Sequence, residues 1–131
     1  MKKILVVDDN ELLCRLACDI LHTEGYHASA ATSAAEALEA LENDQFDLVV
    51  TNFAMPGMSG LDLQKELASR KIKIPVIVVS AHDDASIRGL AHEFGAVAFF
   101  KKPVDDQALI DAIHWATEAS RRKSGPILNS K

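Results

Sequence analysis

Short runs of aliphatic and β-branched residues alternate five times along this chain with segments of helical hydrophobic periodicity. The runs cover residues 3–7, 27–31, 48–51, 76–80 and 96–100. The first, third and fourth are almost unbroken Val, Ile and Leu, which is typical of parallel strands covered on both faces. Such alternation predicts right-handed βαβ crossovers. We therefore expect an α/β fold: a five-stranded parallel sheet of order 2-1-3-4-5, doubly wound into a (βα)5 three-layer sandwich.

The segments between the runs carry the signals of helix starts and stops. Ser33 with Glu36 predicts a capping box, in which each residue satisfies a backbone N–H of the other. Ser59 and Asp105 are expected N-caps, and Gly25 stands where the first helix should end. Beyond about residue 120 the pattern dissolves, so we expect one domain over residues 1–120 and a linker or tail over 121–131.

Charge and hydropathy exclude several classes of protein. The chain has 19 acidic and 14 basic residues, a net charge of -5, which disfavours direct binding of DNA or RNA by this segment. Its apolar runs fall far short of the roughly 18 residues that span a membrane, so a cytoplasmic location is expected. Cys14 and Cys18 lack the spacing and companions of a zinc or redox site, and we interpret them as small apolar residues.

Polar residues stand at the carboxyl ends of the predicted strands, where ligands bind in open α/β sheets. The first strand ends in Asp8 and Asp9, the third in Asn52, the fourth in Ser80, and Lys102 follows the fifth. Each alone has a plain structural explanation, such as a helix cap, a turn or a surface lysine. Together they predict a site for Mg²⁺ and phosphate, because Mg²⁺ prefers a few carboxylates with water and phosphate oxygens.

The motifs at these positions resemble the receiver domains of two-component signalling. The resemblance runs from about Lys2 to Thr117, and its motifs are specific in combination. They are Ile4-Leu5-Val6-Val7-Asp8-Asp9-Asn10, the segment 47–60 with Asn52 three residues before Met55-Pro56, Pro75-Val76-Ile77-Val78-Val79-Ser80-Ala81, and Lys102-Pro103.

The resemblance implies a role for each site residue. Asp8, Asp9 and the backbone carbonyl of Ala54 would hold Mg²⁺, together with the side chain at position 52. Ser80 would donate its hydroxyl to a phosphoryl oxygen. The resemblance gives further roles to the residues of the fifth strand and the turn after it: Lys102 would pair with the phosphate, Pro103 would follow a cis peptide bond, and Phe99 would be an aromatic switch that moves with Ser80.

Asn52 departs from the family, whose phosphoacceptor at this position is an aspartate. A carboxamide oxygen is a far poorer nucleophile than a carboxylate oxygen. The chain is therefore expected to be non-phosphorylatable as given and to bind Mg²⁺ weakly, and it is not expected to be an enzyme. The change is either engineered or natural; a natural one makes the chain a pseudo-receiver that acts by docking, without phosphate.

The resemblance also implies partners. They are a histidine kinase or phosphotransfer protein, and an output domain or a second copy bound through the fourth helix, fifth strand and fifth helix, around Ala91, Phe99 and Lys101. The sequence disfavours two other classes of protein. A phosphotransferase or phosphatase with its nucleophile at this edge is disfavoured by Asn52. A flavin carrier is disfavoured by the acidic loop at Asp8 and Asp9, which would repel a phosphate.

Overall fold

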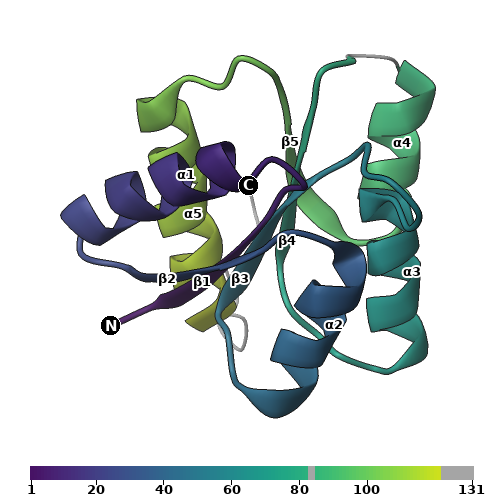
Figure 1. Cartoon of the computed structure of the whole chain (residues 1–131), viewed down its shortest axis with the longest axis horizontal. Coiled ribbons are helices and arrows are strands. Elements are labelled where there is room, and N and C mark those ends of the chain that lie inside the picture. The colour runs from purple at the N-terminus through teal and green to yellow at the C-terminus, as the bar shows by residue number, and fades with distance from the viewer. Residues whose placement is uncertain (83–84, 122–131) are drawn as a thin grey trace.

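The computed structural model describes residues 1–82 and 85–121. Within them strands and helices alternate from the first strand to the last helix (Figure 1). The elements are β1 (Lys3–Val7), α1 (Glu11–Thr23), β2 (His27–Ala31), α2 (Ala34–Asn43), β3 (Leu48–Asn52), α3 (Gly60–Ser69), β4 (Val76–Ser80), α4 (Ala85–Glu93), β5 (Ala96–Lys101) and α5 (Asp106–Arg121).

The five strands form one parallel sheet of order β2-β1-β3-β4-β5, which confirms the fold expected from the sequence. Helices α1 and α5 cover one face, and α2, α3 and α4 cover the other (Figure 1). The strand order reverses between β1 and β3, so the loops that leave these two strands diverge to opposite faces. A ligand site is expected at such a point.

Side chains of the central strands alternate between two apolar cores, because successive residues of a strand point to opposite faces of the sheet. The core beneath α2, α3 and α4 takes Leu5, Val7, Val49 and Val78. The core beneath α1 and α5 takes Ile4, Val6, Val50 and Ile77. Both cores end at the polar residues that follow the strands, so the candidate site lies directly above packed apolar side chains.

Two strands extend one residue beyond the apolar runs that predicted them. β3 includes Asn52, which lies opposite Val79 in the ladder, and β5 includes Lys101, which lies opposite Ser80. Asn52 and Lys101 are polar and so do not belong to the apolar runs, but their backbones continue the pairing of the strands. Asn52 is therefore held as a strand residue rather than on a loop.

The expected N-caps are confirmed, with one correction. The Ser33 hydroxyl accepts from the N–H of Glu36 at 3.1 Å, and the Asp105 carboxylate accepts from the N–H of Ala108 at 2.9 Å. The capping box at Ser33 was wrong, because the Glu36 carboxylate accepts from the N–H of Thr32 at 2.8 Å. The reciprocal box forms instead at Ser59, whose N–H and hydroxyl both bond Asp62.

In the part of the chain that the structure describes, no helix is long and apolar enough to span a bilayer. α5 continues to Arg121, and residues 122–131 of the expected tail lie outside the described residues. The Gly25 expectation holds: α1 ends at Thr23, and Gly25 follows with a φ of 92°, a left-handed conformation that glycine adopts without strain.

Candidate functional site

The carboxyl ends of the three central strands bring the candidate residues to one edge of the sheet. Asp8 follows β1 directly, Asn52 ends β3 and Ser80 ends β4. All three are buried, with relative exposures of 8%, 9% and 1%. Buried polar side chains need partners, so the contacts of these residues define what the edge can do.

Asp8 is bonded on both of its carboxylate oxygens. Oδ2 lies 3.2 Å from the Lys102 ammonium nitrogen, and Oδ1 accepts from the backbone N–H of Asn10 at 2.9 Å. Lys102 is positioned by its own backbone, whose N–H donates to the carbonyl of Ser80 at 2.8 Å, and its peptide bond to Pro103 is cis. The ion pair therefore links the residue after β1 to the residue after β5, across the polar edge of the sheet.

Asp9 and Asn52 form a second pair. The Asn52 side-chain nitrogen Nδ2 donates to the carbonyl of Ala54 at 2.8 Å and to Oδ1 of Asp9 at 3.3 Å. Asp9 is exposed, whereas Asn52 is buried beneath it. Three of the four residues that the resemblance assigns to a cation are thus brought into direct contact, with the amide nitrogen of Asn52 bonded to the other two.

Ser80 lies at the same edge, and its hydroxyl is hydrogen-bonded to the loop that follows β4. Its Oγ accepts a hydrogen bond from the backbone N–H of His82 at 3.0 Å. This bond fixes the first turn of the loop after β4. His82 itself is exposed, and its contribution here comes from its backbone.

The donor set at this edge fits a hard divalent cation. Asp8 and Asp9 supply carboxylate oxygens and Ala54 a backbone carbonyl, and Mg²⁺ is commonly held by one or two carboxylates with water completing its shell. Among the described residues, no group of three or more His, Cys, Asp and Glu side chains could hold a metal ion.

Gly60 is a site residue that sequence reasoning missed. A Cβ added there would lie 2.4 Å from the backbone oxygen of Asn52 and 3.1 Å from Cα of Phe53. The Gly60 N–H also donates to the carbonyl of Phe53 at 2.7 Å. The start of α3 is therefore pressed against the end of β3, an approach between elements that only glycine allows.

Cys14 is a second missed residue. Its thiol donates to the carbonyl of Asp8 at 3.2 Å and lies 3.7 Å from the carbonyl of Ala31. Burial, and then the nearby Asp8 carboxylate, raise the pKa of this thiol from 9.0 to about 11. It stays protonated at neutral pH, so it acts as a buried hydrogen-bond donor beneath the acidic loop rather than as a nucleophile.

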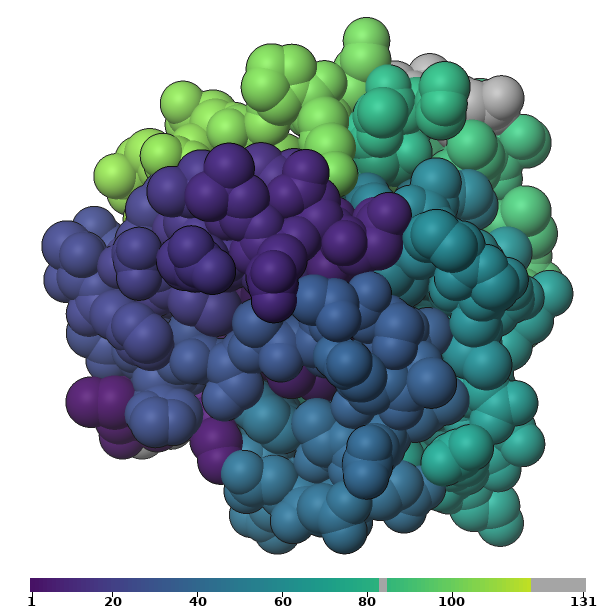
Figure 2. Space-filling view, in the orientation of Figure 1, coloured from purple at the N-terminus to yellow at the C-terminus, as the bar shows by residue number. Residues whose placement is uncertain are grey.

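A groove of about 640 Å³ runs from the polar edge between α1 and α5. Its polar end is formed by Asp8, Asn52 and Lys102, and its walls by apolar residues that include Leu13 and Leu16. Both leucines are more than two-fifths exposed. In the space-filling view the purple atoms of α1 and the yellow-green atoms of α5 meet on one face (Figure 2).

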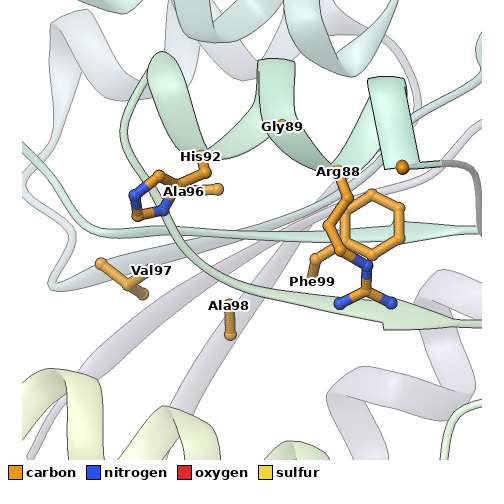
Figure 3. Close-up of a pocket in the computed structure, with 8 residues that line it drawn as sticks. Arg88, Gly89, His92, Ala96, Val97, Ala98 and Phe99 are labelled. Carbon is orange, nitrogen blue, oxygen red and sulfur yellow. The ribbon is translucent and has the colours of Figure 1, made fainter.

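A separate pocket of about 460 Å³ lies between α4 and β5. Figure 3 shows the Arg88 guanidinium over the ring of Phe99, with Cζ 4.7 Å from the ring centroid. Phe99 is half-buried and Lys101 exposed, as a surface role requires. The prediction that Ala91 lies on the output surface is wrong. Ala91 is 0% exposed, because it faces the core beneath α4.

An open parallel sheet of order 2-1-3-4-5 with acidic residues at its switch point defines the flavodoxin-like class to which chemotaxis receivers belong. The comparison with known families is more specific. The response regulator receiver domain family matches residues 4–114, and the chain belongs to this family.

Relatives and solved structures agree with this assignment. Nodulation protein W of Bradyrhizobium diazoefficiens is 37% identical over 92% of this chain and 53% of its own length. Sporulation initiation phosphotransferase F of Bacillus subtilis is 30% identical over 86% of this chain and 90% of its own. A receiver domain protein (CheY-like) of Methanospirillum hungatei superposes with a TM-score of 0.88 at 27% identity, over 94% of this chain and 98% of its own.

The family defines the general role of the chain. Receiver domains are signalling modules of two-component response regulators, which interact with histidine kinases and often carry output domains. They generally bind Mg²⁺ at an acidic site. The chain spans about half or less of the length of the transcriptional regulators among its relatives.

Proposed function

We propose that this chain is the receiver module of a two-component phosphorelay in which Asn52 occupies the phosphoacceptor position, so that the chain takes no phosphoryl group. The supporting observation is the location of Asn52. It ends β3 at the switch point, within hydrogen-bond distance of Asp9 and at the edge that Lys102 and Ser80 share. An acceptor carboxylate here would share the edge with a cationic side chain and a hydroxyl group.

The surrounding residues have the chemistry for phosphoryl transfer, and the nucleophile is the part that is missing. Lys102 supplies a cation, now paired with Asp8, that can neutralise a phosphoryl oxygen. Ser80 supplies a hydroxyl donor. Asp8, Asp9 and the Ala54 carbonyl would hold Mg²⁺, which when bound offsets charge on the phosphoryl oxygens.

The partner surfaces follow from the same assignment. We infer that a histidine kinase or phosphotransfer protein approaches the polar edge, and that the output acts through α4, β5 and α5. Phe99 would be the switch residue of that face, because its half-buried ring can change its packing against Arg88. An output domain following α5, or a second copy of the chain, would read this face.

A phosphate-independent pseudo-receiver is the second candidate, and two hydrogen bonds of Asn52 favour it. The Asn52 amide donates to both Asp9 and Ala54, so these acceptors have a hydrogen-bond donor without any phosphoryl group on position 52. In this candidate the chain regulates its partner by docking alone.

Restoring the acceptor separates the two candidates. Asn52→Asp should gain one phosphoryl group from acetyl phosphate in the presence of Mg²⁺: the new carboxylate oxygen bonds to phosphorus, the bond from phosphorus to the acetate oxygen breaks, and acetate leaves. Intact mass should rise by one phosphoryl group. The adduct should be cleaved by hydroxylamine, as an acyl phosphate is. The unaltered chain should show no adduct.

Asn10→Asp is the matched control. It makes the same chemical change two residues from Asp8, and Asp is an equally good N-cap for α1. It should take no phosphoryl group. Phosphorylation of the unaltered chain would reveal another acceptor and refute the proposal. An inert Asn52→Asp variant that folds would favour the pseudo-receiver.

A further inference from the structure

We propose that the side-chain amide of Asn52 takes the place of the divalent cation at this edge, so that the chain holds its site arrangement without metal and Mg²⁺ must displace the amide to bind. The inference rests on the proposed assignment of Asp9 and Ala54 as cation ligands. It assigns Asn52 a structural role at the edge, in addition to its proposed inability to accept a phosphoryl group.

The contacts of Nδ2 carry the inference. This nitrogen lies 2.8 Å from the Ala54 carbonyl oxygen and 3.3 Å from Oδ1 of Asp9, two of the oxygens that the proposed assignment gives to the cation. An amide nitrogen has two N–H donors, and each is directed to one of these oxygens. Asn52 is 9% exposed, so water has little access to replace either contact.

The same geometry excludes Asn52 as a metal ligand in its present orientation. Turning the amide over would bring Oδ1 to the carbonyl of Ala54, two acceptors with no proton between them. That arrangement is favourable only with a cation between the oxygens. Metal binding through Oδ1 and the observed hydrogen bonds are therefore mutually exclusive, and the two states differ by a flip of one amide.

The other carboxylate is compensated in the same way. Asp8 bonds the Lys102 ammonium group and the N–H of Asn10, so its charge is balanced within the fold. An aspartate at position 52 would replace two donor contacts by repulsion from Asp9 and from the Ala54 carbonyl dipole. With Asp at position 52, the arrangement of the edge would need a cation to offset this repulsion. With Asn52 it needs none.

Magnesium titration of Asn52→Ala tests the displacement. Removing the amide removes the competitor, so Mg²⁺ should bind about fivefold more tightly to Asn52→Ala than to the unaltered chain, the worth of one net hydrogen bond. Amide shifts of Asp9 and Ala54 report binding. Asn43→Ala, which removes an exposed amide on α2, is the control and should leave the affinity unchanged. Equal or weaker binding to Asn52→Ala would overturn the inference.

Thermal unfolding in EDTA and in Mg²⁺ gives a second measurement that needs no titration. The melting temperature of the unaltered chain should be almost insensitive to Mg²⁺. That of Asn52→Asp should be lower in EDTA and should rise with Mg²⁺. An equal Mg²⁺ response of the two proteins would count against the inference. These melting experiments contain no phosphoryl donor, so they test the amide displacement alone. The proposed function fails in a different experiment, if Asn52→Asp takes no phosphoryl group from acetyl phosphate.

Discussion

The polar edge around Asn52 and the face formed by α4 and β5 are built in opposite ways. At the edge, contacts join residues far apart in the chain, such as Asp8 with Lys102 and Asp9 with Asn52, and most of these side chains are buried or half-buried. Of the nine residues of α4, by contrast, Ala91 alone is buried. α4 leaves a pocket of about 460 Å³ against β5.

The difference shows how a receiver can sense at one place and respond at another. An element with few buried contacts opens or shifts at a lower free-energy cost than one fixed by many. The edge is the fixed part, so a change of charge there alters the balance of forces without moving the site. α4, with one buried residue, should cost less to move than the edge, and its Arg88 lies over the ring of Phe99.

Two residues of α3 connect these regions. Gly60 touches the carbonyl of Asn52, and Gln64, one turn later, donates to the carbonyls of Ala91 and Phe94 at 2.9 and 3.1 Å. Gln64 is 1% exposed, and its Oε1 has no partner among the described residues. Substitutions on α3 and α4 therefore test whether the edge is rigid and α4 loosely held.

Gly60→Ala should have the largest effect. The added methyl would lie 2.4 Å from the Asn52 oxygen, which belongs to the backbone of a central strand and cannot yield cheaply. Overpacking of this kind should lower the free energy of unfolding by about 3 kcal/mol. Urea unfolding measures it. A change below about 1 kcal/mol would mean that the edge accommodates the methyl, and the contrast with α4 would fail.

Gln64→Leu should have the next largest effect. The substitution keeps the side chain's size but leaves the buried carbonyl of Ala91 without its donor, which should cost about 1–2 kcal/mol. Hydrogen exchange should accelerate most in α4, because Gln64 holds the end of that helix. Uniform acceleration across the sheet would show that α4 unfolds only with the whole domain, against the proposed looseness.

The sequence predicted the fold closely because each layer leaves a local signal. Buried parallel strands are unbroken aliphatic runs, and their ends are marked by Asp8, Asn52 and Ser80. The rule that ligands bind beyond the carboxyl ends of such strands then brought the candidate site residues to one edge before any contact was known.

What the sequence did not reveal depends on distances between elements. Gly60 follows a turn-like stretch and gives no sign that it meets the Asn52 carbonyl. Ala91 lies at a helical position whose side faces the core, and it was the family resemblance that placed this residue on the output surface. The Asn52 amide could be assigned to a metal from its position alone, whereas its actual partners required the side-chain geometry.

Gly89→Ala should have the smallest effect and the opposite sign to Gly60→Ala, although both add one methyl group to a helical glycine. Gly89 lies inside α4, it is exposed, and an added Cβ meets nothing within 4 Å. Alanine restricts the unfolded chain and favours the helix, so the free energy of unfolding should rise by about 0.5–1 kcal/mol. The methyl also lies at the pocket between α4 and β5, and should slow hydrogen exchange in α4. Chemical denaturation of both variants side by side decides the comparison. Destabilisation by Gly89→Ala would mean that α4 is packed as tightly as the edge, and the response would then have to come from another element.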